Sequence, residues 1–323
     1  MRLKALIIGL GQVGLRFDLE KERAAAGIWT HFSAYLQLSQ DFEIVAAIDP
    51  KRENWDFALS RKPDLKCFES INDFLKSGLI VDIASICTPD AFHIQNAKQI
   101  LPHVRGLFIE KPFCTPAEIA QAQAFVAQIK TQKKSVRVNY FKRGEPSVLQ
   151  MLKRIKSGDE IIRHVQCKYS GPFDAVGSHA VDLMQWVSPC TELLGRLAHP
   201  HPEGMGWSAF FKSEQGLEAL LYTGPRHDLI FELEVVTDKS RFRLSENLQK
   251  FETFELKPSL RYKNYSEYFK SAELDLLPNQ ERFVSDLREL YKEILNPMEV
   301  NYKSVDSALK TQDLIFNICT PNR

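Results

Sequence analysis

The segment LKALIIGLGQVG at residues 3–14 decides the fold. Its apolar run, interrupted only by Lys4, is typical of a buried parallel strand, and the glycines that follow have the spacing G-x-G-x-x-G. Gly9 permits the tight turn, Gly11 lets a pyrophosphate approach the backbone, and Gly14 allows close packing of helix on strand. The segment therefore predicts a dinucleotide-binding unit with a helix N-terminus facing the phosphates.

Strands and helices continue to alternate beyond these glycines. Apolar runs that read as further parallel strands occupy residues 42–48, 81–87 and 104–109. The last run ends in Glu110-Lys111-Pro112, and Pro112 stops the strand because it has no N–H to donate. Alternation of this kind predicts a doubly wound parallel sheet, in which ligands bind beyond the carboxyl ends of the strands.

The second strand ends in Asp49, an acid suited to binding the adenine ribose. A carboxylate there accepts hydrogen bonds from the ribose hydroxyls and repels a 2′-phosphate, which predicts NAD as the cofactor. Lys51 and Arg52 follow closely and keep NADP open as an alternative.

The distance from Gly14 to Asp49 is 35 residues, whereas about 20 separate glycines and acid in the simplest pattern. The excess lies in the polar stretch at residues 16–29. We interpret this stretch as an insertion that interrupts the first helix, which resumes near Thr30. Two interpretations remain open: an inert solvated loop, or a flap over the cofactor cleft.

Length and composition favour a two-domain protein. The chain has 323 residues, and its predicted domains are a Rossmann domain at 1–113 and an α+β domain at 114–323. A formal net charge of +1 gives no electrostatic reason to expect nucleic acid or a membrane as a partner. The sequence contains no membrane-spanning stretch and no signal-peptide core, which predicts a cytoplasmic protein.

The second half predicts a large, open, mostly antiparallel sheet. Its expected strands lie at residues 162–169, 206–212, 217–222, 228–237, 240–245 and 250–256, and its helices at 147–157, 279–295 and 304–318. We interpret His199-Pro200-His201-Pro202 as an exposed loop, and no metal site is predicted. The segment from Arg261 to Lys270 reads as an edge or interface loop.

Taken together, the glycine motif, Asp49, Thr88-Pro89 with His93, and Glu110-Lys111-Pro112 resemble the Gfo/Idh/MocA oxidoreductase family. The resemblance implies a Rossmann domain followed by an α/β domain whose open sheet supports the substrate site and oligomer contacts. It also implies hydride transfer between NAD(P) and a sugar, sugar acid or nucleotide sugar, in a homodimer or homotetramer. The form Gly-Ser-His-x-x-Asp-Leu at residues 177–183 resembles a subgroup associated with surface-glycan or nucleotide-sugar biosynthesis.

The resemblance and the chemistry of the side chains give each candidate residue a role. His179 has an ordinary pKa of about 6.5 and suits proton transfer. Lys111 suits holding the substrate oxygen and sharing that proton, since burial lowers the pKa of a lysine. The cofactor residues are predicted to be Gly9, Gly11, Gln12, Val13, Gly14 and Asp49 for the pyrophosphate and ribose, Thr88, Pro89 and His93 for the nicotinamide side, and Glu110 for its ribose. The predicted substrate contacts are Tyr140, Arg143 and Asp182.

One position departs from the family pattern Asp-x-Gly-x-His. Gly177 and His179 match, but Ala175 stands where the acid is expected, and Asp174 comes one residue early. This departure motivates an alternative function, a catalytically silent dinucleotide-binding regulator or scaffold.

Overall fold

The computed structural model describes residues 2–20, 27–214, 216–224, 229–276 and 283–320. It divides into two compact units, the first made of residues 1–141 and 280–312 and the second of residues 142–279 and 313–323. The predicted boundary after residue 113 falls inside the first unit, because the next strand and two later helical segments pack there. No helix in these described ranges is both long and apolar enough to cross a membrane.

The first unit contains a parallel sheet with the strand order β3-β2-β1-β4-β5-β6. Its strands are β1 (Leu3–Ile8), β2 (Phe42–Ile48), β3 (Lys66–Phe68), β4 (Ile83–Ile86), β5 (Gly106–Ile109) and β6 (Ser135–Val138). The order reverses between β1 and β4, the place where open α/β sheets bind ligands. The predicted doubly wound sheet is confirmed.

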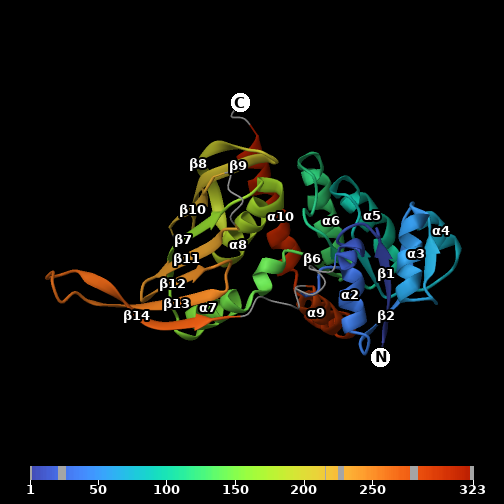
Figure 1. Cartoon of the computed structure of the whole chain (residues 1–323), viewed down its shortest axis with the longest axis horizontal. Helices are drawn as coiled ribbons and strands as arrows, with labels where there is room; N and C mark the ends of the chain where they lie inside the picture. Colours follow the sequence, from blue (N-terminus) through green and yellow to red (C-terminus); the bar gives the residue numbers. More distant parts are fainter. Residues whose placement is uncertain (1, 21–26, 215, 225–228, 277–282, 321–323) are drawn as a thin grey trace. The chain divides into compact units, whose positions relative to one another are not determined.

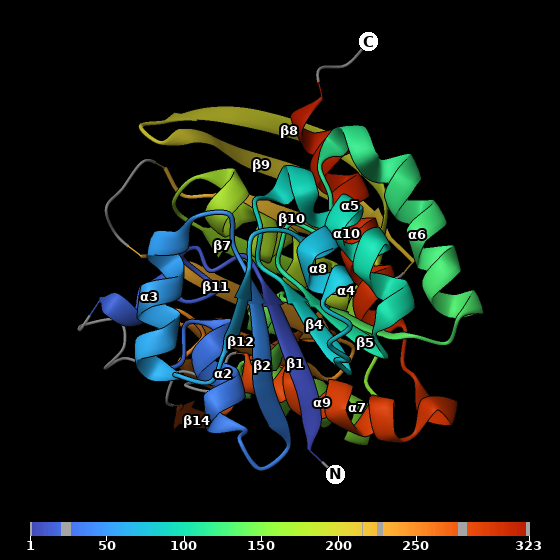
Figure 2. The ribbon, with the colours of Figure 1, turned by 90° about the vertical axis from the view of Figure 1, so that its right-hand side faces the viewer.

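Helices cover both faces of this sheet (Figures 1 and 2). One face packs against α4 (Ile71–Lys76), α5 (His93–Ile100), α6 (Ile119–Thr131) and the first part of α10 (Lys303–Cys319). The other packs against α2 (His31–Gln37), α3 (Arg52–Arg61) and α9 (Val284–Leu295). Arg137 on β6 fastens α9 through ion pairs with Asp286 and Glu293.

The helix after the glycine motif is interrupted, as the sequence predicts. A first turn runs through a short 3-10 helix, η1 (Arg16–Leu19), and α2 begins only after Thr30, whose hydroxyl caps it by accepting from the Ser33 amide. The amides of His31 and Phe32 donate to the carbonyls of Val13 and Gly14 at 3.0 and 3.1 Å. In an uninterrupted α-helix these two carbonyls would accept from the amides of residues 17 and 18.

These hydrogen bonds connect α2 directly to the glycine turn. The helical pattern continues across the insertion as though residues 17–30 were absent. Removing these 14 residues from the 35-residue separation of Gly14 and Asp49 leaves 21, close to the usual value of about 20. The inserted segment is itself anchored, because Asp18 accepts hydrogen bonds from Thr30 and Ser33 and pairs with Arg61.

The second unit contains an eight-stranded sheet with the order β14-β13-β12-β11-β7-β10-β9-β8, antiparallel except between β7 and β10. Its strands are β7 (Ile162–Tyr169), β8 (Cys190–His201), β9 (Gly204–Ser213), β10 (Leu217–Tyr222), β11 (Phe231–Thr237), β12 (Ser240–Ser245), β13 (Lys250–Pro258) and β14 (Ser266–Asp275). Two sequence-based interpretations are corrected: His199 and His201 lie within β8, and much of the segment from Arg261 to Lys270 belongs to β14.

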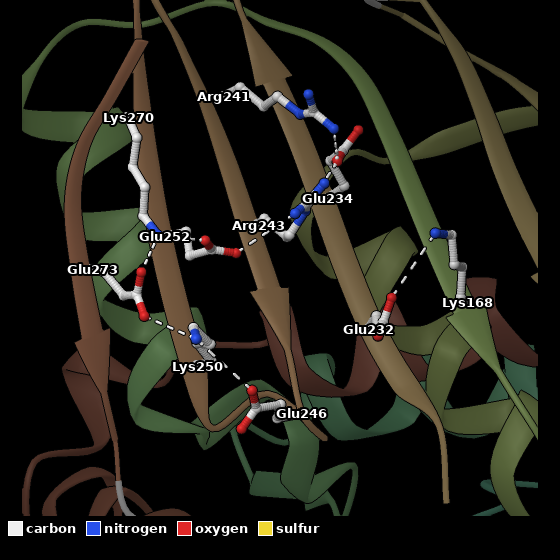
Figure 3. A network of polar contacts seen from close by, with 10 residues as sticks. All are labelled: Lys168, Glu232, Glu234, Arg241, Arg243, Glu246, Lys250, Glu252, Lys270 and Glu273. Carbon is white, nitrogen blue, oxygen red and sulfur yellow. Dashed lines mark hydrogen bonds and ion pairs between the residues drawn. The ribbon is translucent and has the colours of Figure 1, made fainter. Parts of the chain in front are cut away.

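One face of this sheet packs against α7 (Pro146–Ser157), α8 (Ser178–Val187) and the end of α10. On the other face, side chains of β7, of β11 to β14 and of the turn after β12 form a charge ladder (Figure 3). It comprises Lys168, Glu232, Glu234, Arg241, Arg243, Glu246, Lys250, Glu252, Lys270 and Glu273. With five positive and five negative side chains, the charge ladder itself is formally neutral.

Candidate functional site

A cavity of about 610 Å³ opens at the carboxyl ends of β1, β2 and β4. This volume lies within the range of small-molecule and cofactor sites, about 300–1,000 Å³. Six of the predicted cofactor residues line it: Gly9, Gly11, Gln12, Asp49, Thr88 and Pro89. The strand order therefore gathers, at one point of the first unit, residues that are up to 80 positions apart in the sequence.

Three glycines shape the cradle beside this cavity. A Cβ atom on Gly9, whose φ is +94°, would lie 2.7 Å from the Cys87 carbonyl oxygen, and one on Gly14 would lie 2.1 Å from the Gly9 carbonyl oxygen. A Cβ on Gly11 would meet no atom within 4 Å, because this residue faces open space. Gly9 and Gly14 are thus required by packing, whereas Gly11 leaves room for a ligand.

The same turn presents unused donors. In the part of the chain that the structure describes, the amides of Gln12, Val13 and Gly14 donate to no protein acceptor. Amides in a turn at the start of a helix form an anion-binding site because their dipoles favour negative charge. The cradle therefore fits the pyrophosphate of a dinucleotide.

Asp49 lies at the rim of the cavity and is held there by two backbone amides. One of its oxygens accepts from the Leu10 amide at 2.7 Å, and the other accepts from the Lys51 amide at 2.9 Å. The acid thereby ties the glycine turn to the end of β2. Each carboxylate oxygen can accept a further bond, so both ribose hydroxyls have acceptors.

His93, predicted for the nicotinamide side, connects two strand ends. Its Nε2 lies 2.7 Å from the Thr88 carbonyl oxygen, and its Nδ1 lies 2.7 Å from the Pro112 carbonyl oxygen. Carbonyl oxygens only accept, so a neutral ring with one N–H could donate to only one of them. His93 is buried and does not line the cavity.

Glu110 points into the core of the first unit. Its Oε1 accepts from His31 Nε2 at 2.7 Å and from the Asn139 amide nitrogen at 2.6 Å. Burial alone would raise the pKa of this carboxyl, but the hydrogen bond and charge of His31 and the amide of Asn139 bring the pKa below its ordinary value. Lys111, the next residue, is half-buried where β5 has ended.

His179 lies in the first turn of α8 and is buried. A single π-helical turn, η6 (Phe173–Gly177), precedes α8, and the amide of Gly177 lies 3.5 Å from the Pro172 carbonyl oxygen five residues earlier. A π-turn holds one residue more than an α-turn. Asp174 lies within this π-turn and is exposed, whereas His179 follows in the first turn of α8.

Arg143 and Asp182 form a buried pair in the second unit. The guanidinium donates through Nε to Asp182 Oδ2 at 2.7 Å and through a terminal nitrogen to Oδ1, and it lies over the Trp186 ring at 4.5 Å. Both carboxylate oxygens thus bind one fork of the guanidinium. Asp182 is fully buried, which suits it to orienting Arg143.

Asp182→Asn is expected to lower the free energy of unfolding by about 3–5 kcal/mol, because it leaves the Arg143 charge buried without its counter-ion. Glu232→Gln is the matched control. It breaks the partly exposed pair with Lys168 on the charge ladder, and we expect a loss of about 1 kcal/mol or less. Urea denaturation of both variants measures the difference; equal losses would contradict this prediction.

The predicted residues fall into two groups. Within the first unit, the glycines, Asp49, Thr88 and Pro89 come together, whereas Tyr140 is fully buried in the core. Within the second unit, α8 carries both His179 and Asp182. The roles in catalysis and substrate binding stay predictions.

Sequence reasoning missed several polar residues of the cavity, namely Arg16, Asn54, Ser70, Asn96 and Gln99. Ser70 alone carried a readable signal: it caps α4 by accepting from the Asp73 amide, and a Ser-x-x-Asp pattern marks a helix start. Arg16 begins the insertion, where no periodicity applies.

The fold and cavity define a dinucleotide-binding domain of the Rossmann type. Residues 3–140 match a family model, GFO_IDH_MocA, described as an oxidoreductase family with an NAD-binding Rossmann fold. This match covers fewer than half of the 323 residues, and within it the chain is similar to the Gfo/Idh/MocA oxidoreductases. No curated protein is similar to the chain at a significant level.

Solved structures share the fold over nearly the whole chain. A dehydrogenase from Chromobacterium violaceum has a TM-score of 0.76 at 16% identity, covering 98% of this chain and 94% of its own. UDP-N-acetylglucosamine 3-dehydrogenase GnnA from Acidithiobacillus ferrooxidans has 0.73 at 15%, covering 98% and 97%. KijD10, a 3-ketoreductase from Actinomadura kijaniata in complex with NADP and TDP-benzene, has 0.73 at 14%, covering 98% and 97%.

Proposed function

We propose that this protein transfers hydride between NAD(P) and the hydroxyl or keto carbon of a sugar, sugar acid or nucleotide sugar. The observation that carries the proposal is the cavity of the first unit, where the amides of Gln12, Val13 and Gly14 and the side chain of Asp49 suit the two polar parts of a dinucleotide. The similar solved structures include a nucleotide-sugar dehydrogenase and a ketoreductase, which supports this class of substrate.

Gln12, Val13 and Gly14 would hold the pyrophosphate through their amides, and Asp49 would hold the adenine ribose. The bound nicotinamide supplies the hydride acceptor or donor. Oxidation of an alcohol removes a hydride from carbon and a proton from oxygen, so the protein must provide a base. We assign the proton to His179 and Lys111 together, and the orientation of the substrate oxygen to Lys111.

The remaining predicted contacts follow from the same scheme. Arg143 would present its guanidinium to the substrate, and Asp182 would orient it, because the two are already joined by a bidentate pair. Asp174, which lies in the π-turn before α8, would take the part of the acid absent at Ala175. Tyr140 remains a proposed contact, and a cytoplasmic homodimer or homotetramer remains the predicted state.

The proposal is tested by titrating the protein with NADH and NADPH and then following reduced-nicotinamide absorbance with a panel of sugars, sugar acids and nucleotide sugars. We expect tighter binding of NADH than of NADPH, because Asp49 repels a 2′-phosphate, and turnover with one class of the panel. Binding without turnover would favour the silent regulator. Absence of binding would refute the interpretation of the cavity.

A further inference from the structure

His31 stands at the centre of a buried polar chain in the first unit. Its Nδ1 lies 2.9 Å from the Ser85 hydroxyl oxygen, which lies 2.9 Å from the Tyr35 hydroxyl oxygen. Its Nε2 lies 2.7 Å from Glu110 Oε1. His31 and Ser85 are fully buried, and Tyr35 is 1% exposed. The hydrogen-bonded series is therefore buried at its tyrosine end, and its most exposed member is Glu110.

The direction of these hydrogen bonds follows from the groups that can only accept. An ionised Glu110 only accepts, so His31 Nε2 must carry a proton. In a neutral ring Nδ1 then accepts from the Ser85 hydroxyl, and Ser85 accepts from Tyr35. Burial raises the pKa of Tyr35 far above its ordinary value, so this phenol keeps its proton. With a neutral ring the hydrogen bonds run in one direction from Tyr35 to Glu110, and with a protonated ring Nδ1 donates to Ser85 instead.

The surroundings leave His31 little freedom to turn. Its ring packs against Phe108 at a centroid distance of 4.6 Å and against the edge of Phe283 at 5.1 Å. The backbone amide of His31 donates to the Val13 carbonyl and thereby connects α2 to the glycine turn. One residue therefore joins the cofactor cradle to the strand end that carries Lys111.

We propose that His31 is a positioning residue for the reaction: it holds Glu110 ionised and turned inward, and thereby fixes the backbone and the charge beside Lys111. The titratable groups that act on Glu110 are His31 from α2, His93 from α5 and Cys87 after β4, and the neutral Asn139 amide after β6 also donates to it. His31 and Asn139 are the side chains that share Oε1, so loss of His31 removes half of that support.

The proposal rests on the proposed function where turnover is measured, and on the fold alone where stability is measured. In His31→Phe the apolar contacts remain but no donor reaches Glu110, so burial raises the carboxyl pKa. We expect kcat to fall by about tenfold or more with NADH affinity within a few-fold. We also expect the acidic limb of the kcat profile to move up by about one pH unit.

Three further variants separate positioning from packing. His31→Gln keeps an amide N–H near the place of Nε2, and it is expected to restore most of kcat and the original pH limb. Tyr35→Phe removes the far hydroxyl and is expected to leave the limb in place. Glu110→Gln combined with His31→Phe is expected to cost little more kcat than Glu110→Gln alone, since His31 acts through Glu110.

A second readout needs no substrate. The lowered pKa of Glu110 adds stability that is present above the unfolded-state pKa and is lost as the pH falls through the folded-state pKa. The melting temperatures of wild type and His31→Phe should therefore differ most near neutral pH and converge in acid. The double variant should show no such convergence relative to Glu110→Gln.

The two proposals fail in different ways. A wild-type protein without any turnover would count against the proposed function and would leave the melting experiment decisive for His31. An unchanged acidic limb in His31→Phe, together with a melting difference that is constant with pH, would overturn the role of His31 and leave the proposed function standing.

Discussion

Replacing Gly11 with alanine is expected to weaken NADH binding by about tenfold or more, about 1.4 kcal/mol, while the protein stays folded. The added methyl group meets no protein atom within 4 Å and enters the space assigned to the pyrophosphate. We expect the free energy of unfolding to change by about 0.5 kcal/mol or less. Fluorescence titration with NADH and urea denaturation measure the two quantities.

Gly14→Ala is the matched variant with the opposite pattern. Its methyl group would lie 2.1 Å from the Gly9 carbonyl oxygen, which belongs to backbone and cannot move aside. We expect a loss of more than about 4 kcal/mol of stability or failure to fold. If Gly11→Ala destabilised the protein as much as Gly14→Ala, the assignment of Gly11 to a ligand space would be wrong.

Lys111→Ala is expected to lower turnover by about 10²–10⁴-fold, the usual contribution of a positioned proton-transfer group, and to leave NADH affinity within a few-fold. Lys111 follows the end of β5 and does not line the cofactor cavity, so binding and turnover should separate. Steady-state kinetics and NADH titration provide the measurement.

Two controls sharpen this prediction. Lys111→Arg keeps the positive charge but cannot release a proton in the working range, so residual activity in this variant measures the charge alone. Lys66→Ala removes an exposed lysine of β3 in the same unit and should change neither quantity. Full turnover of Lys111→Ala would refute the catalytic assignment.

Local patterns predicted most strands because each carries its own periodicity. Leu3–Ile8, Phe42–Ile48 and Ser240–Ser245 have the bounds expected from the sequence. β8 was missed because His199 and His201 flank Pro200, and proline argues against a strand. At the sheet edge Pro200 is tolerated, since a missing N–H there breaks no ladder on the outer side.

Pairing over long sequence distances was beyond local reasoning. α9 returns to the first unit through Arg137, which lies 149 residues before its partner Asp286. Likewise His31 meets Glu110 across 79 residues. The acid at Asp49 and the glycines were predictable because their roles follow from one strand and one turn, whereas the polar chain around Glu110 depends on how three separate segments pack.

The hydrogen bonds that connect the glycine turn to α2 limit what residue numbers alone can say about the spacing of a motif. The carbonyls of Val13 and Gly14 accept from the amides of His31 and Phe32. The helical hydrogen-bond pattern is therefore continuous, although residues 17–30 intervene in the sequence. The junction is thus a place where length can be gained or lost without moving the cofactor acid. Spacing rules for such folds hold along the bonded path, and a sequence search that counts positions alone would overlook proteins built this way.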